Sequence, residues 1–145
     1  MPEKIQFAGK SRFLSAEKRK NIRLLLENTA AIENYEIQNL TYIIMTDDEL
    51  LEINQTHLQH DDYTDIITFD LSDIEASIDG EIYVSIDRIK ENAVQFKCTE
   101  EEELIRVLSH GLLHLLGYKD KSEKDIVVMR QKEADCLQRY KEISQ

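Results

Sequence analysis

The chain has 145 residues, 41% of them hydrophobic and 32% charged, which is enough for one domain with a buried core and argues against a disordered protein. No apolar run approaches the roughly 20 residues of a membrane span, and the charged first ten residues lack the apolar stretch of a secretory signal, so we expect a cytoplasmic protein outside the membrane. The formal net charge of −11, taken as a sum, argues against a nucleic-acid partner.

The charge is distributed unevenly along the chain. Residues 1–23 carry seven basic and two acidic side chains (7 − 2 = +5), residues 24–87 carry sixteen acidic side chains and no Lys or Arg, and residues 88–145 carry eleven of each sign. The seven basic residues are Lys4, Lys10, Arg12, Lys18, Arg19, Lys20 and Arg23. Because exposed charges are screened beyond about 8 Å at physiological salt, a local basic face can still hold an anion. A solvated surface with accidental charge blocks is the alternative interpretation.

The first predicted element is a short strand near Ile5–Ala8. A helix from about Ser15 to Asn34 follows, capped by Ser15. Its expected buried face holds Ile22, Leu25, Leu26 and Thr29. The β-prone stretch Ile37–Met45 predicts a second strand. Asp47 is then expected to cap a helix that contains Leu50, Leu51, Ile53 and Asn54.

Two further strands, Thr64–Asp70 and Glu81–Ile86, are indicated by β-branched and aromatic residues. The acidic segment Ser72–Gly80 between them is expected to be a loop, and Asp87 to open a helix that ends near Lys97. Thr99 and Glu102 form a capping box for the next helix, which runs to about Leu116 and stops at Gly117. A last amphipathic helix spans roughly Ser122–Ile143.

Four strands and five helices that do not alternate strictly predict an α+β fold, in which a small mixed β-sheet packs against helices. With one proline, four glycines and no Ser- or Gly-rich linker, residues 1–145 are expected to form a single domain. Cys98 and Cys136 lack the spacing of a metal site or a disulfide framework and are expected to be reduced thiols.

The stretch Ser109–Asp120 (SHGLLHLLGYKD) carries a candidate metal site. His110 and His114 are four residues apart, so on a helix their imidazoles lie on one face and can meet one ion. Gly117 ends the helix, and three more residues, reaching at most about 10 Å, let Asp120 return to the same ion. Two nitrogens and one oxygen suit a single zinc ion with an open coordination position.

The apolar residues around the two histidines strengthen this prediction, because a histidine pair at this spacing is by itself a weak signal. Leucines, isoleucine and valine surround them, so the helix is expected to be buried and its imidazoles to need partners. The alternative is a pair of hydrogen-bonded core histidines, with Asp120 an ordinary turn residue.

The spacing His-x3-His-x2-Gly-x2-Asp matches the geometry of metzincin zinc proteases, so we expect a metzincin-like zinc helix. The glutamate that usually follows the first histidine, and serves those enzymes as the general base, is Gly111 here. The sequence therefore disfavours an ordinary metalloprotease and identifies no general base.

At the same residues the chain resembles the YbeY endoribonuclease family, whose signature is H-G-x-L-H-L-x-G-Y-D-H. His110–Tyr118 (HGLLHLLGY) fits this signature, and Asn54, Thr64–Phe69 and Gly80–Ile82 resemble further family landmarks in the same order. The resemblance implies an α+β, zinc-dependent hydrolase that cuts single-stranded RNA, with roles in 16S rRNA maturation and ribosome quality control. Its implied partners are rRNA and, as a further candidate, the small ribosomal subunit.

Two positions depart from the family pattern. Lys119 and Asp120 stand where the family usually has Asp and His, so the third metal ligand becomes a carboxylate, which should make bound water less acidic. Leu58 stands where the family usually has an arginine that is thought to contact RNA. The leucine at position 58 therefore bears on the level of nuclease activity rather than on the metal site.

Several other polar residues are weaker candidates. Lys119 and Lys121 could neutralise a phosphate, although solvated turn lysines are the more ordinary interpretation. Asp65 could support the metal or act as a base, or it could bond the backbone at a strand start, whereas His57 and His60 are expected at the surface. A metzincin-like metallopeptidase and a non-catalytic, zinc-containing ribosome-assembly factor remain alternatives to the nuclease.

Overall fold

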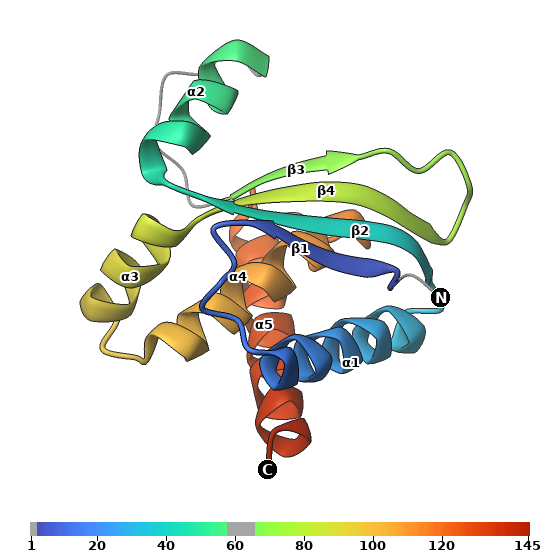
Figure 1. The fold of residues 1–145 in the computed structure, drawn as a ribbon. Helices are drawn as coiled ribbons and strands as arrows, with labels where there is room; N and C mark the ends of the chain where they lie inside the picture. The colour runs from blue at the N-terminus through green and yellow to red at the C-terminus, as the bar shows by residue number, and fades with distance from the viewer. Residues whose placement is uncertain (1–2, 58–65) are drawn as a thin grey trace.

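Within residues 3–57 and 66–145, the part of the chain that this computed structural model describes, a four-stranded sheet forms the centre of the fold (Figure 1). Its strands are β1 (Ile5–Gly9), β2 (Glu36–Met45), β3 (Ile66–Asp70) and β4 (Ser77–Ser85), in the spatial order β1-β2-β4-β3. β1, β2 and β4 are mutually parallel, and β3 pairs with β4 in the antiparallel direction. The sheet is mixed, as predicted.

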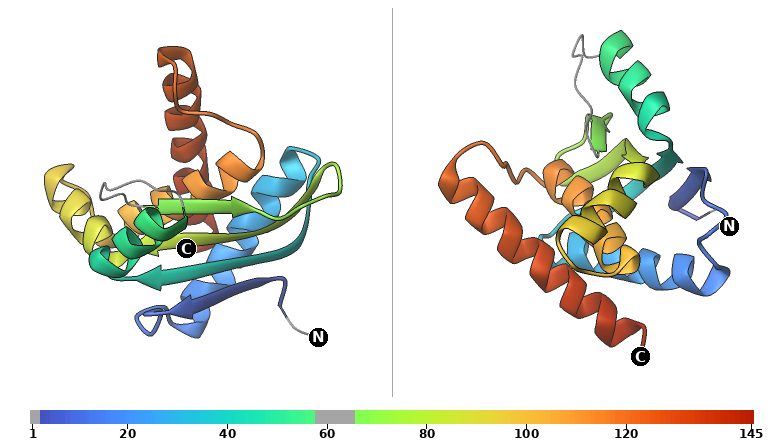
Figure 2. Two further views of the ribbon diagram at one scale, coloured as in Figure 1. Left: turned by 90° about the horizontal axis from the view of Figure 1, so that it is seen from above. Right: turned by 90° about the vertical axis from the view of Figure 1, so that its left-hand side faces the viewer.

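Five helices accompany the sheet in the described part of the chain: α1 (Ala16–Ile32), α2 (Asp47–His57), α3 (Ile86–Gln95), α4 (Glu100–Leu115) and α5 (Glu123–Ile143). Figures 1 and 2 show α1 and α4 on one face of the sheet, α5 packed outside them, and α2 on the other side. The α+β architecture and both element totals agree with the prediction.

The main core lies between the sheet and helices α1 and α4, because both helices bury an apolar face there. Ile22, Leu25, Leu26 and Thr29 of α1 are all buried, as expected from their spacing. Tyr42 of β2 is fully buried and its hydroxyl donates to the Leu108 carbonyl of α4 at 2.8 Å, so the sheet and α4 are joined by a polar bond within this core. A smaller core of Met45, Leu50 and Ile67 holds α2 against the opposite face.

Helices α1 and α4 begin where the predicted capping residues lie. Ser15 accepts from the Lys18 N–H, and Thr99 and Glu102 form the expected capping box of α4. Ser122 forms a second capping box, with Asp125, at the start of α5. These bonds satisfy amide groups that a helix start otherwise leaves without partners.

Three boundaries differ from the prediction. Asp47 does not cap α2: the Thr46 hydroxyl accepts from the Glu49 N–H at 3.2 Å, and the Asp47 carboxylate instead pairs with Arg88. β4 begins at Ser77, so Ser77–Gly80, the end of the segment expected to be a loop, is strand. β4 pairs with β2 from Glu36 opposite Ser77 onward, and the backbone hydrogen bonds of this pairing extend the strand. The acidic composition of the segment could not predict this pairing.

The third difference lies where β4 meets α3. Ile86, expected to end the strand, is the first residue of the helix, and Ser85 rather than Asp87 accepts from the Arg88 N–H.

Among the described residues, no helix combines the length and apolar character that a bilayer crossing needs.

Candidate metal centre

Helix α4 brings two imidazoles to one point. Because α4 is a regular helix from Glu100 to Leu115, His110 and His114 lie one turn apart on the same side. Their Nε2 atoms are 2.9 Å apart, and the ring planes are nearly perpendicular, at 84°. Both side chains are partly exposed rather than fully buried, so the point at which they meet is open to solvent on one side.

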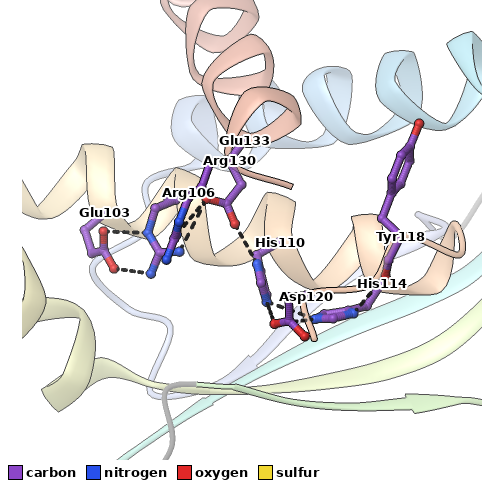
Figure 3. Close-up of polar contacts among 8 residues, drawn as sticks. All are labelled: Glu103, Arg106, His110, His114, Tyr118, Asp120, Arg130 and Glu133. Carbon is purple, nitrogen blue, oxygen red and sulfur yellow. Dashed lines mark hydrogen bonds and ion pairs between the residues drawn. The ribbon is translucent and has the colours of Figure 1, made fainter. Parts of the chain in front are cut away.

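Asp120 reaches the same point from the loop between α4 and α5. Gly117, with φ at 103°, adopts the left-handed conformation that favours glycine and turns the chain back at the helix end. The amide of Tyr118 donates to the Leu113 carbonyl at 3.0 Å and closes the turn. Asp120 Oδ2 then lies 3.4 Å from Nε2 of both His110 and His114. Figure 3 shows the three side chains converging.

The outward nitrogens of the two rings carry the protons. Nδ1 of His110 lies 2.6 Å from Glu133 Oε2, and Nδ1 of His114 lies 3.1 Å from the Tyr118 carbonyl oxygen. A carboxylate and a carbonyl only accept hydrogen bonds, so each Nδ1 is the donor. In the neutral imidazole, a proton on Nδ1 leaves a lone pair on Nε2, and in each ring Nε2 points toward the other ring and toward Asp120.

Two lone pairs and a carboxylate oxygen that meet in this way favour a cation between them. Around a tetrahedral zinc ion with bonds of about 2.0–2.1 Å, ligand atoms lie roughly 3.3–3.4 Å apart. The two separations of 3.4 Å to Asp120 match this value, whereas the 2.9 Å between the two Nε2 atoms is shorter, so the rings would have to move slightly apart around an ion. All the donor atoms lie within 4.8 Å of one another, and His110, His114 and Asp120 thus form a group that could hold a metal ion.

A largely buried chain of ion pairs contacts His110 at Nδ1. Glu133 of α5 is 3% exposed and lies beside Arg106 of α4, whose Nη1 is 3.5 Å from Glu133 Oε1. Arg106 also makes a two-pronged contact with buried Glu103, with bonds of 2.9 and 2.7 Å (Figure 3). Burial raises the pKa of Glu133, but the hydrogen bond from His110 and the charges of Arg106 and Arg130 outweigh it, and the pKa lies below its ordinary value.

Sequence reasoning missed Glu133, although the sequence held a signal for it. Met129, Glu133, Cys136 and Tyr140 are the buried residues of α5, so Glu133 occupies the apolar stripe of an amphipathic helix. A carboxylate at such a position needs a hydrogen-bonding or charged partner. The partner itself, His110, could not be identified without knowing how α5 packs on α4.

The turn that carries Asp120 is held to α1 by a second polar cluster. The Tyr118 hydroxyl donates to Glu33 at 2.8 Å, and the Lys132 ammonium pairs with Glu33 at 3.2 Å and lies over the Tyr118 ring. The hydrogen bond from Tyr118 lowers the pKa of Glu33, with a smaller contribution from Lys132. These bonds fix the Tyr118 backbone, whose carbonyl orients His114.

Gly111 faces the sheet at a place where even a Cβ atom would require neighbouring side chains to shift. A Cβ atom at this position would lie 2.8 Å from Ile66 Cδ1 and 3.0 Å from Ile82 Cδ1. The glutamate that metzincin proteases carry after their first histidine would therefore need a different packing of α4 on β3 and β4. A hollow of about 150 Å³ lies beside the candidate metal site and is lined by His110, Asp120, Ile126, Met129 and Arg130.

The other candidate residues are placed as follows. Lys119 and Lys121 are exposed on either side of Asp120. Cys98 and Cys136 are free thiols, as predicted. Leu58, His60 and Asp65, together with the side chain of His57, lie outside what the structure describes.

Comparison with known proteins gives a consistent result. Residues 4–141 match the family model described as Endoribonuclease YbeY. The protein named Endoribonuclease YbeY from Cytophaga hutchinsonii is 50% identical over 119 residues, which cover 82% of this chain and 83% of that protein. The protein of the same name from Christiangramia forsetii is 39% identical over 133 residues, 92% of each. The solution structure of TM1509 from Thermotoga maritima is 31% identical, with a TM-score of 0.65 and coverage of 94% of this chain and 88% of that one.

Proposed function

The chain belongs to the endoribonuclease YbeY family, and we propose that it is a zinc-dependent, single-strand-specific endoribonuclease that acts in 16S rRNA maturation and ribosome quality control. The observation that carries the metal dependence is the convergence of His110, His114 and Asp120 on one point. RNA, and rRNA in particular, is the substrate class that the family name supports. The small ribosomal subunit is the proposed place of action.

His110, His114 and Asp120 are proposed to be the metal ligands. A divalent cation held by them supplies Lewis acidity at a phosphate oxygen of the substrate. Glu133 and the Tyr118 carbonyl keep protons on the two Nδ1 atoms, so that both Nε2 atoms stay available as ligands. Two imidazoles and one carboxylate form a set that zinc accepts readily, and this composition supports zinc as the ion.

Arg130 lies where a substrate phosphate would approach. Its side chain lines the hollow beside His110 and Asp120, and its Nη1 bonds Glu133 Oε1 at 3.0 Å. A guanidinium has five N–H donors, so Arg130 can hold Glu133 and still pair with a phosphate. We assign it the role of a positioning residue for the RNA backbone.

Metal content and RNA cleavage, measured on the same preparations, test this proposal. Wild type is expected to contain one zinc ion per chain and to cleave a single-stranded RNA, and Asp120→Ala to lose most of both. Zinc-loaded wild type that leaves single-stranded RNA intact would reject the nuclease function. Asp120→Ala with a full zinc content would reject Asp120 as a ligand.

The metallopeptidase alternative has less support, because Gly111 stands where metzincins carry the glutamate that serves as general base. Incubation of the zinc-loaded protein with casein and with single-stranded RNA separates the two functions, since each predicts cleavage of one substrate only. A non-catalytic assembly factor is the third candidate. It predicts that ribosome binding survives His114→Ala and that neither substrate is cut.

A further inference from the structure

A second hollow lies away from the candidate metal site, between the turn that follows β1 and the start of α3. Its volume is about 490 Å³, and it is lined by Gly9, Lys10, Arg12, Phe13, Ile86 and Lys90. An adjoining hollow of about 340 Å³ shares Phe13, Ile86 and Lys90 and extends to Glu100 at the first turn of α4. Glu100 precedes His110 by ten residues, or about 15 Å along the helix.

The turn after β1 is held rigidly. Gly9 has a φ of 72°, and a Cβ there would lie 2.2 Å from the Ile44 carbonyl oxygen, so only glycine allows this close approach. The Arg19 guanidinium donates to the Ser11 carbonyl at 2.9 Å and to the Leu14 carbonyl at 3.1 Å. Ser11 and Leu14 are buried, whereas the two residues between them are exposed. The side chains of Arg12 and Phe13 therefore project into solvent from a backbone that these hydrogen bonds hold in place.

Three cations from two elements surround this hollow. Arg12 and Lys90 have no ion-pair partner among residues 3–57 and 66–145, and both are exposed. Lys10 is 3.9 Å from Glu49, but both side chains are more than half exposed, so the pair contributes little. None of the described residues that line this hollow is acidic, whereas Glu100 and Glu101 line the adjoining one. This is a local excess of positive charge on a chain whose net charge is −11.

An aromatic ring stands among these cations. Phe13 is 45% exposed, although a ring of its size is usually buried. Cations that follow a backbone, together with an aromatic face on which a base can stack, form the arrangement that recognises single-stranded nucleic acid. An acidic peptide would use the cations but would gain little from the ring.

We propose that the Lys10–Arg12–Phe13–Lys90 surface binds a single-stranded segment of RNA, with phosphates on the cations and a base on Phe13. The inference rests on the proposed function and adds a contact surface distant from the metal centre. Because it is distant, a long RNA would occupy both sites and a short one only the metal centre. The acidic remainder of the molecule weakens long-range attraction, but at distances under about 8 Å the local cations dominate.

RNA affinity measured over a range of salt concentrations tests this surface. Fluorescence anisotropy of a labelled 12-nucleotide single-stranded RNA, with the full-length protein in chelator, keeps the RNA intact. Arg12→Ala/Lys90→Ala is expected to weaken binding and to reduce the slope of log affinity against log salt by about 1.4, since each lost phosphate contact on a single strand contributes about 0.7. Lys4→Ala/Lys20→Ala removes the same charge elsewhere and serves as the control.

A second variant tests the aromatic contact. Phe13→Leu keeps an apolar side chain but removes the ring, and it is expected to weaken binding about five- to 100-fold without changing the salt slope. Equal effects of the two double variants, or a Phe13→Leu variant that binds like wild type, would overturn the proposal. If an acidic peptide competes as well as RNA in wild type, the partner is a protein surface and the RNA proposal is wrong.

The two proposals can fail separately. Cleavage of a short RNA by the zinc-loaded protein depends on the metal centre and should be equal in wild type and Arg12→Ala/Lys90→Ala. If wild type cleaves RNA and the double variant binds it equally well, only the surface proposal fails. If wild type cleaves no RNA but loses affinity through these substitutions, only the nuclease function fails.

Discussion

Protonation of Nδ1 in His110 and His114 determines whether their Nε2 atoms can act as ligands at the candidate metal site. Glu133 and the Tyr118 carbonyl each accept from an Nδ1 atom, so both imidazoles offer Nε2 lone pairs. Such outer hydrogen bonds fix the tautomer and the orientation of a ligating histidine. Glu133 would therefore influence a metal ion at this site through His110 rather than by direct contact.

We expect Glu133→Gln to lower zinc affinity about 10–100-fold, because the neutral amide is a weaker acceptor for His110. Competition with a chromogenic chelator measures this affinity without any need for catalysis. Asp135→Asn, on the same helix and bonded only to Gln131 among the described contacts, is the control. Zinc affinity that is unchanged in Glu133→Gln would show that His110 needs no such partner.

The convergence of the three candidate ligands could be predicted from the sequence, whereas the residues that orient them could not. His110 and His114 are linked by helical spacing and Asp120 by a short turn, so all three depend on local geometry. Glu133 is 23 residues from His110, and its contact depends on how α5 lies across α4. Arg130 reaches its place beside the metal-binding group through the same packing.

At the scale of elements, α4 is the helix on which the site depends, and its close approach to the sheet requires Gly111. Gly111→Ala is expected to destabilise the protein by about 1–3 kcal/mol, because the new methyl group would overlap Ile66 and Ile82. Urea denaturation measures the change. In an unconstrained helix the same substitution stabilises by roughly 0.5–1 kcal/mol, so a gain in stability would contradict the packing.

The α4 capping box gives the fold a dependence on pH. The hydrogen bond from the Thr99 amide, followed by the Lys141 pair, lowers the pKa of Glu102 from its ordinary value of 4.5. A carboxylate whose pKa is lower in the folded state stabilises the fold above that ordinary value, and this contribution is lost as the pH falls through the folded pKa.

The difference in unfolding free energy between wild type and Glu102→Gln should therefore be present at pH 7 and shrink as the pH falls below about 4.5. Urea unfolding at several pH values measures it. Exposed Glu27→Gln, for which the structure shows no capping contact among the described residues, controls for the loss of a charge. A difference that stays constant from pH 7 to pH 3 would contradict this role of Glu102.

The elements themselves followed from local patterns, whereas the starts of α2 and β4 did not. Thr46 rather than Asp47 caps α2, because Asp47 is engaged by Arg88 of α3. β4 begins at Ser77 rather than at the predicted Glu81, because β2 pairs with it from Glu36 onward. In both cases a partner distant in sequence decided the boundary.

At the scale of the whole molecule, the metal-binding group joins α4 to the loop before α5, so a bound ion should stabilise the entire fold. Zinc at 100 times its dissociation constant is expected to add about 2.7 kcal/mol. For a protein of this size the melting temperature should rise by roughly 5–10 °C. Calorimetry with and without zinc measures the rise, and His114→Ala should lack it. An equal rise in that variant would locate zinc elsewhere.

The order of the site along the chain has a consequence during synthesis. His110, His114 and Asp120 all lie in the last third of the sequence, and Glu133 comes still later, on the final helix. A ribosome that is translating this protein therefore releases the whole sheet before the helix that orients His110 has emerged. Until α5 has emerged, a nascent chain lacks Glu133, the carboxylate that orients the His110 ring, so the candidate metal site is complete only after α5 has been synthesised and packed on α4.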